Sequence, residues 1–381
     1  MRDAHPCHRA DGRGWTSLRP PRSGSCHALR LLRPHCYGEN AAMKAVRYHG
    51  PRMPFRLEDV PVPEPGPGEV RVRVEAAGVC HTELHFQSGL LDLGIAPVTM
   101  GHEIAGTVDA VGSGVDTRRH GDRVIVYYYA GCGTCEWCER GEENLCARPR
   151  AELGFMSDGG YAEFVVAPAR NAVPIPDSLS FTDAAPIGCG VTTALHACEL
   201  ARVSPGDTVA VYGMGGVGYG LIQIASLRGA RTIGIGRSPE KLALARALGA
   251  DAVVNAAQAD DVAAQVRALT DGRGADVVFE LVATAPTMTA SMGMLARRGR
   301  VVFVGYSEDA LTVHPIQLVI LEAQVLGSVG NTLAELEEAV RLVADGKVRT
   351  VVDRVLPLES YGTALEALRE GRVLGRVVLA P

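Results

Sequence analysis

The sequence predicts an α/β protein of two domains, one rich in β-strands and one built on a doubly wound parallel sheet. Its 381 residues, of which 47% are hydrophobic, exceed what one ordinary core encloses. Residues 43–186 have the pattern of short strands and turns, whereas residues 187–327 alternate short apolar strands with helices. The second pattern is typical of a parallel sheet that helices cover on both faces.

The first 42 residues follow neither pattern, and we expect them to form a disordered N-terminal extension. They hold seven Arg, no Lys and three acidic residues. Mitochondrial transit peptides share this bias, but prolines at positions 6, 20, 21 and 34 would interrupt the amphipathic helix of such a peptide. Only three of the 38 basic residues in the chain are Lys, a bias typical of GC-rich genes, in which spurious upstream starts are common. We therefore expect Met43 to be the native start.

The β-rich domain contains one clearly alternating strand. Val70, Val72 and Val74 alternate with charged residues, Arg71 among them, which predicts one apolar face and one solvated face. After residue 327 the chain offers an amphipathic helix (LAELEEAVRLVADGK) and a final strand. We expect this tail, residues 328–381, to return to the first domain.

Charge and hydropathy narrow the classes of partner. The formal net charge is −5, without a basic stripe that could follow a phosphate backbone, so we expect no nucleic acid partner. No apolar run reaches the roughly 18 to 20 residues that span a bilayer. We expect a soluble, cytoplasmic protein whose partner is a small-molecule substrate.

Four of the ten cysteines fall within fifteen residues, with the spacing C-x2-C-x2-C-x7-C. Without a secretory signal, such a cluster indicates a metal site more than a disulfide framework. Four thiolates close the tetrahedral shell of zinc and leave no position for substrate. Unrelated buried cysteines and an iron–sulfur cluster are the alternatives. The predicted ligands of this structural zinc are Cys132, Cys135, Cys138 and Cys146.

Three further candidate ligands are scattered along the chain. Cys80 lies in GVCHTELH, His102 in GHEIAGTV, and Cys189 in AAPIGCGV at the junction of the two regions. Each residue alone is more often an ordinary buried or hydrogen-bonded group. Together, two Cys and one His with an open fourth position form a known catalytic zinc shell.

A glycine-rich turn predicts a dinucleotide site. The G-x-G-x-x-G pattern follows the strand TVAVY and opens a helix, as this fingerprint requires. Its glycines permit a tight turn and a close approach to the pyrophosphate at the positive helix end. The cofactor-binding glycines are Gly213, Gly215, Gly216 and Gly218.

The end of the next strand favours NADP(H) over NAD(H). An acid for the adenosine ribose of NAD is expected about twenty residues after the fingerprint, but residues 219–239 contain no Asp or Glu. Instead Gly236 is followed by Arg237 and Ser238, which leave room for a 2′-phosphate and supply groups that bind it. Lys241 is a further candidate contact. The alternative is that Arg237 is a solvated charge and NAD binds without the usual carboxylate.

With these motifs in this order, the chain from Met43 to its end resembles the zinc-dependent alcohol dehydrogenases of the medium-chain dehydrogenase/reductase family. The resemblance implies a GroES-like β-barrel catalytic domain (residues 43–186 and 328–381) and a Rossmann domain (187–327). It further implies two zinc ions per subunit, a homodimer or homotetramer, and hydride transfer between an alcohol and an aldehyde or ketone with NAD(P)(H).

The resemblance also assigns roles to single residues. Cys80, His102 and Cys189 match the catalytic zinc ligands, and Glu103 matches the acid that approaches the metal during ligand exchange. Glu83 stands where many relatives have the Asp that orients the zinc-bound His, so the extra methylene affects how His102 is held.

Four other residues match functional positions of the family. Thr82 and His85 match the proton relay, in which a histidine with a pKa near 6.5 exchanges protons with solvent. His81 matches the basic residue near the cofactor pyrophosphate. Thr193 matches a residue that contacts the nicotinamide.

The substrate and the assembly are less well specified. We expect at least one of Tyr127, Tyr128 and Tyr129 to line a pocket for medium-sized primary, allylic or benzylic alcohols. The segments VVFVGY and VLGSVG offer sheet edges for pairing between subunits. A zinc-independent enone or quinone reductase is an alternative function that the three catalytic ligands argue against. A non-catalytic NADPH-binding sensor is the other alternative, since it would keep the structural zinc without needing the relay.

Overall fold

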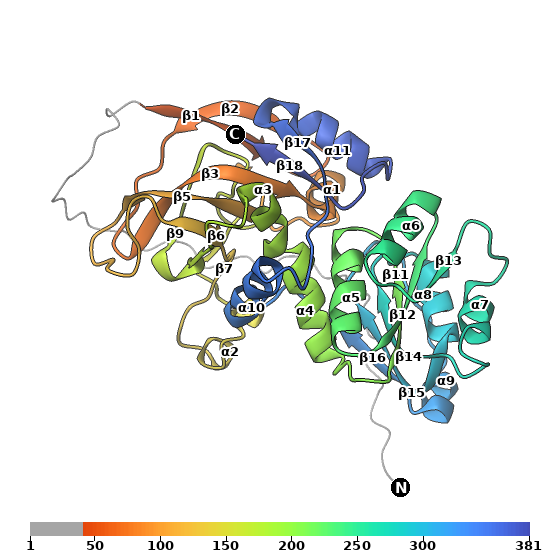
Figure 1. Cartoon of the computed structure of the whole chain (residues 1–381). Helices are drawn as coiled ribbons and strands as arrows, with labels where there is room; N and C mark the ends of the chain where they lie inside the picture. Colours follow the sequence, from red (N-terminus) through yellow and green to blue (C-terminus); the bar gives the residue numbers. More distant parts are fainter. Residues whose placement is uncertain (1–40) are drawn as a thin grey trace, which may run out of the picture. The chain divides into compact units, whose positions relative to one another are not determined.

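A computed structural model describes residues 41–381 of the protein (Figure 1). The disorder and the transit peptide considered for the N-terminal extension fall on residues 1–40, outside the described residues. Strand β1 (Ala42–Tyr48) begins one residue before Met43.

The first sheets are mainly antiparallel. Strand β1 lies between β2 (Arg56–Pro61) and β4 (Val98–Thr99). The larger sheet has the order β10-β6-β5-β3-β18-β17, with β9 also paired to β3. Its strands are β3 (Glu69–Val79), β5 (Glu103–Val111), β6 (Arg123–Val126), β9 (Phe164–Pro168), β10 (Ala172–Pro174), β17 (Val352–Pro357) and β18 (Arg376–Ala380). Strands from the C-terminal tail therefore complete a sheet that begins near the start of the described chain.

One expectation for β3 is wrong. Val70, Val72 and Val74 are buried as predicted, but Arg71 is only 2% exposed rather than solvated. Its guanidinium forms ion pairs with Asp109 at 2.7 Å and with Glu64 at 3.0 Å. These partners compensate the charge that burial would otherwise penalise.

The second sheet has six parallel strands in the order β13-β12-β11-β14-β15-β16. This is the doubly wound order of a Rossmann fold, and the predicted fold class is confirmed. The strands are β11 (Thr208–Tyr212), β12 (Arg231–Gly236), β13 (Ala252–Asn255), β14 (Ala275–Glu280), β15 (Leu295–Phe303) and β16 (Gln324–Gly327).

Helices cover both faces of this sheet (Figure 1). Apolar side chains of α5 and α6 pack on one face, together with Val209, Val211 and Phe279. Side chains of α7, α8 and α9 pack on the other face, together with Ile233 and Val278. The helices are α5 (Gly216–Leu227), α6 (Pro239–Ala247), α7 (Val262–Ala268), α8 (Ala285–Gly293) and α9 (Pro315–Leu321).

The remaining elements connect and surround these sheets. They are α1 (His81–Ser88), α2 (Glu136–Glu139), α3 (Phe181–Ala184), α4 (Gly190–Leu200), α10 (Leu333–Ala344), α11 (Tyr361–Arg369), the two-stranded ladder of β7 (Tyr129–Ala130) and β8 (Ala151–Glu152), and the short 3-10 helices η1 (Glu143–Leu145), η2 (Ala169–Asn171), η3 (Ala185–Gly188) and η4 (Leu358–Ser360). None of the helices in residues 41–381 combines the length and the hydropathy that crossing a bilayer requires.

Only one of the two segments expected at a sheet edge lies there. Strand β16, which opens the segment VLGSVG, is the edge of the parallel sheet. The segment VVFVGY instead begins inside β15, which is paired on both sides by β14 and β16. Its apolar character reflects burial in the sheet rather than an open edge.

Candidate active site and metal centres

Four predicted residues from three distant segments meet in one buried cluster. Cys80 lies between β3 and α1, His102 directly precedes β5, which begins at Glu103, and Cys189 lies between η3 and α4. The candidate ligand atoms of these residues all lie within 4.8 Å of one another. Strands β3 and β5 are antiparallel neighbours with Gly78 opposite Glu103, which brings the two cluster segments together.

The residue before His102 explains how its side chain comes to lie in the cluster. Gly101 has φ +93°, a left-handed conformation that favours glycine, and a Cβ at this position would lie 2.3 Å from the Tyr161 ring. The Tyr161 hydroxyl donates to the carbonyl of Gly78 at 3.1 Å, so the ring is fixed. The glycine of the GHE motif is therefore required by packing next to the ligand.

The donor set of the cluster fits zinc. Two thiols and one imidazole are ligands that zinc prefers, and three protein ligands leave a fourth position open. His102 Nδ1 faces Glu83 Oε1 at 3.3 Å, although neither atom completes a hydrogen bond within the described residues. Glu83 Oε2 accepts a 2.8 Å hydrogen bond from the Cys80 backbone N–H. With Nδ1 turned to this carboxylate, Nε2 of His102 is left for the metal.

Arg376 lies against the cluster and was not predicted. Its Nη2 is 3.8 Å from the Sγ atoms of both Cys80 and Cys189, and its Nε donates to Glu103 Oε1 at 2.9 Å. The side chain is buried. The signal in the sequence is an arginine in RVVLA, an otherwise apolar strand, but nothing local indicates that it faces residues far earlier in the chain.

The charges of the cluster are strongly coupled. A hydrogen bond from Cys189 and the nearby Arg376 hold the pKa of the Cys80 thiol well below its usual value, despite burial. The same hydrogen bond, together with burial, raises the pKa of Cys189. Burial raises the pKa of Glu103 to about 7, against the opposing effect of Arg376. The positive charge of Arg376 thus lies next to Cys80 and Glu103, two acidic groups of the cluster.

The predicted relay residues lie on one helix beside the cluster. Thr82 Oγ1 is 3.6 Å from Cys80 Sγ, and His85 follows three residues later on the same face of α1. Burial lowers the pKa of His85. Its ring lies 4.5 Å from the ring of Tyr306, which the sequence did not indicate. His81 begins α1 with an exposed side chain.

Aromatic rings form a wall next to His102. The rings of Tyr128 and Phe155 lie 5.3 and 4.9 Å from the imidazole, and they stack on each other at 5.6 Å. Tyr129 packs on Tyr128 at 4.3 Å. Phe155 was not predicted from the sequence, because no motif precedes it.

The side chains of the three consecutive tyrosines point in different directions. The Tyr127 hydroxyl donates to the carbonyl of Asn331 at 2.8 Å and is buried away from the cluster. The Tyr129 hydroxyl points at Gly330, where a Cβ would lie 2.3 Å from it. Of the three, Tyr128 has the ring that approaches His102.

The glycine-rich turn has one position that the fold itself does not require to be glycine. Gly213 has φ +117°, and a Cβ at Gly218 would lie 2.1 Å from the Gly213 carbonyl oxygen, so both are needed for the turn. A Cβ at Gly216 would lie 2.5 Å from Arg376 Nη1. Gly215 faces open space, as expected where a ligand approaches the backbone. The N-terminus of α5 and Arg376 together suit a pyrophosphate.

The residues predicted to bind the adenosine ribose and its 2′-phosphate lie at the end of β12 and the start of α6. Arg237 is exposed and forms no ion pair with any of residues 41–381. Ser238 caps α6 by accepting a 3.4 Å hydrogen bond from the Lys241 backbone N–H. Burial, and then the nearby Arg237, lower the pKa of Lys241. Thr193, the predicted nicotinamide contact, places Oγ1 3.9 Å from Cys189 Sγ.

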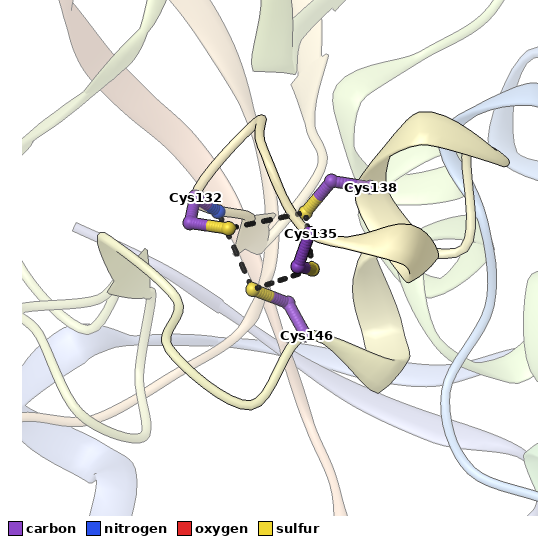
Figure 2. A group of neighbouring side chains, drawn as sticks. All are labelled: Cys132, Cys135, Cys138 and Cys146. Atoms are coloured by element: carbon purple, nitrogen blue, oxygen red, sulfur yellow. Dashed lines mark hydrogen bonds between the residues drawn. The ribbon is translucent and has the colours of Figure 1, made fainter.

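The four-cysteine lobe fits a single tetrahedral metal ion (Figure 2). Neighbouring sulfur atoms are 3.5 to 3.9 Å apart, between Cys135 and Cys138, Cys135 and Cys146, and Cys132 and Cys138. Sulfurs at the usual zinc distance of about 2.3 Å would be separated by about 3.8 Å. None of the four forms a disulfide. A Cβ at Gly131 would lie 2.5 Å from Cys138 Sγ, so glycine is needed for the sulfurs to converge.

Comparisons with known proteins decide the family. Residues 66–177 match the family described as alcohol dehydrogenase GroES-like domain, and residues 216–345 match that described as zinc-binding dehydrogenase. The alcohol dehydrogenase of Geobacillus stearothermophilus is 38% identical over 341 residues, which cover 88% of this chain and 99% of that protein. The chain belongs to the zinc-binding alcohol dehydrogenase family.

Other members of this alcohol dehydrogenase family are similar along their whole length. The NAD-dependent alcohol dehydrogenase of Sulfurisphaera tokodaii is 37% identical over 349 residues, which cover 89% of this chain and all of that protein. The crystal structure of the alcohol dehydrogenase from Aeropyrum pernix has a TM-score of 0.83 and 37% identity, covering 89% of this chain and all of that one. The predicted family membership is confirmed.

Metal analysis tests whether the four-cysteine lobe binds zinc. Replacing one of four thiolates opens the shell, so Cys135→Ser is expected to lower the zinc content by one ion per subunit. The melting temperature should fall by about 5–10 °C. Elemental analysis and thermal unfolding measure both effects. Cys198→Ala, which removes a buried thiol outside both clusters, should keep the full zinc content, and equal content in the two variants would contradict the assignment.

Proposed function

We propose that the protein is a zinc-dependent alcohol dehydrogenase that interconverts an alcohol and an aldehyde or ketone by hydride transfer with NADP(H). The observation that carries the proposal is the buried cluster of Cys80, His102 and Cys189 beside the Thr82 hydroxyl. These three side chains would hold the catalytic zinc. Glu103, paired with Arg376 and within reach of the ligand atoms, is the proposed acid that assists ligand exchange.

The residues around the cluster suit this reaction. When bound, zinc would polarise the substrate oxygen and the nicotinamide would exchange the hydride. Thr82 Oγ1 would accept the proton of the alcohol hydroxyl. Burial lowers the pKa of His85, which favours the neutral form of the imidazole, the form that takes up a proton. Tyr128 and Phe155 would exclude water and favour medium-sized primary, allylic or benzylic alcohols.

The proposed division into domains follows the sheets. Residues 43–186 and 328–381 supply the mainly antiparallel sheets, and residues 187–327 supply the parallel sheet. The cluster residues Cys80 and Cys189 come from different divisions, so the proposed reaction takes place where the catalytic and cofactor regions meet.

The preference for NADP(H) rests on the end of β12. Gly236 leaves the ribose position without a carboxylate, and Arg237 lies near enough to Lys241 to lower its pKa, an effect that Asp353 opposes. A 2′-phosphate would balance both charges. The alternative is a preference for NAD(H), because several relatives are named NAD-dependent.

A subunit contact is proposed along the free edge of β16. Three apolar side chains of α9 are highly exposed, namely Ile316 at 59%, Val319 at 73% and Ile320 at 57%, and Val325 on β16 is 42% exposed. An unpaired strand edge beside an apolar patch favours pairing with a second copy of the chain. We therefore propose a homodimer, or a homotetramer built from such dimers.

Cofactor oxidation against a panel of aldehydes and ketones tests the proposed reaction. Cys189→Ser is expected to reduce turnover at least about 100-fold, because the metal loses one of three protein ligands. Full removal of zinc by a chelator should do the same, whereas Cys198→Ala should keep activity. Turnover that survives full zinc removal would favour the zinc-independent reductase, and inactivity of the wild type toward every class would favour the sensor.

Michaelis constants for NADPH and NADH test the cofactor preference. The wild type is expected to have the higher kcat/KM with NADPH, and Gly236→Asp should shift the ratio toward NADH by about tenfold or more, because the new carboxylate repels the phosphate and binds the ribose. A Cβ at position 236 would meet its nearest atom at 3.4 Å, so a side chain fits. Gly236→Asn is the uncharged control. A wild type that prefers NADH would show the proposal to be wrong.

Sedimentation of the purified protein tests the subunit contact. Val319→Glu places a charge in the exposed apolar patch and is expected to shift the protein to the monomer. Leu227→Glu, on the exposed end of α5 with 51% exposure, is the matched control and should leave the assembly intact. The proposal fails if the wild type is itself a monomer, or if both variants behave alike.

A further inference from the structure

Glu152 occupies a position in the aromatic wall that the proposed reaction does not use. In the short antiparallel ladder of β7 and β8, Glu152 lies directly opposite Tyr129. Side chains of directly opposed residues point to the same face of a sheet. The Glu152 carboxylate therefore stands on the side of Tyr129, whose ring packs on Tyr128 and so continues the wall that reaches His102.

The backbone around Glu152 is fixed while its carboxylate is left free. The Glu152 carbonyl accepts hydrogen bonds from the N–H groups of Phe155, Met156 and Ser157 at 2.8 to 3.1 Å. Within residues 41–381, the carboxylate forms neither a hydrogen bond nor an ion pair, although His102 lies near enough to lower its pKa. By contrast, Glu103 pairs with Arg376 and Glu83 accepts from the Cys80 backbone.

An acid in such surroundings is not explained by the fold. Glu152 is partly buried, and burial raises its pKa to about 7, against the effect of His102. Its charge also raises the pKa of the hydroxyls of Tyr128 and Tyr129, secondary to burial of the two rings, which places it near both. A partly buried carboxylate without a partner costs free energy, so the position suits a group that a ligand brings.

The neighbouring rings indicate what that group is. The wall of Tyr128, Tyr129 and Phe155 offers aromatic faces, which attract cations as a carboxylate does. A carboxylate beside aromatic faces is the combination that binds an ammonium group. A neutral hydroxyl would use the carboxylate but gain little from the rings.

We propose that Glu152 is a specificity-determining residue that binds the ammonium group of the substrate, so that amino alcohols and the matching amino aldehydes are preferred over uncharged substrates of equal size. This inference rests on the proposed alcohol dehydrogenase function and concerns the same pocket. It adds a substrate class to that function.

Three alcohols of equal heavy-atom count test the inference. 4-Aminobutan-1-ol carries an ammonium where pentan-1-ol carries a methyl and butane-1,4-diol a hydroxyl, and the shorter and longer homologues of each allow for the unknown spacing. At a pH of about 8 the amine is charged and so is most of Glu152. With the zinc-loaded full chain, kcat/KM is expected to be highest for one of the amino alcohols.

The variant Glu152→Gln keeps the size of the side chain and removes its charge. It is expected to lower kcat/KM for the preferred amino alcohol by at least about tenfold, mainly through KM, and to change kcat/KM for pentan-1-ol by less than twofold. Glu337→Gln, on the exposed face of α10, is the matched control and should alter neither value.

Each other outcome has a distinct meaning. Equal losses for all three alcohols in Glu152→Gln would overturn the inference and assign Glu152 a structural role. A diol preference that depends on Glu152 would also overturn it, in favour of hydroxyl recognition. Wild-type protein that oxidises pentan-1-ol but no amino alcohol refutes only this inference, whereas protein that oxidises no alcohol of any kind refutes the proposed function.

Discussion

The antiparallel register of β18 and β3 is the constraint on which the active site depends. Val377 lies opposite Val79, so Arg376 arrives beside Cys80. On the other side of β3, Gly78 lies opposite Glu103, and a Cβ at Gly78 would lie 1.9 Å from Glu103 Oε2. The missing side chain thus leaves room for the carboxylate that meets the guanidinium. A buried ion pair of this kind is tolerable only while both partners are present, and the strand pairing supplies them both.

The two cysteine clusters depend on the fold in different ways. The four-cysteine lobe is assembled from residues 132–146, where a short helix and the adjacent Gly131 help to bring the sulfurs together. The catalytic cluster needs β3, β5 and the start of α4, so it exists only when the two regions of the chain are already packed. Metal bound at the lobe would stabilise a loop, whereas metal bound at the cluster would stabilise the packing of the whole chain.

This contrast also explains what could be predicted from the sequence. The candidate ligands and the glycine turn could be predicted from the sequence because short-range chemistry fixes their residue types. The spacing of the sulfurs decides this for the lobe, and the lack of room for a side chain at Gly213 and Gly218 decides it for the turn. The parallel sheet was accessible because burial on both faces leaves continuous apolar strands.

Residues whose role arises from tertiary contacts could not be predicted from the sequence. Arg376 and Phe155 reach the cluster from segments without a motif, and Glu152 becomes notable only through what surrounds it. The alternating pattern assigned Arg71 to a solvent-exposed face of β3. The side chain is buried instead, because its ion pairs compensate the charge. The interior position of the segment VVFVGY could not be told from the edge position of VLGSVG, since both segments are short and mainly apolar.

The segment that follows β16 contacts both the four-cysteine lobe and the tyrosines next to the catalytic cluster. The Asn144 side chain, from the four-cysteine lobe, donates to the carbonyl of Val329. Tyr127 binds the carbonyl of Asn331, and Gly330 accommodates the Tyr129 hydroxyl between them. The four-cysteine lobe, the aromatic wall and the strand at the free edge of the parallel sheet therefore all adjoin residues 329–331, so the position of this one segment constrains the lobe and the wall together.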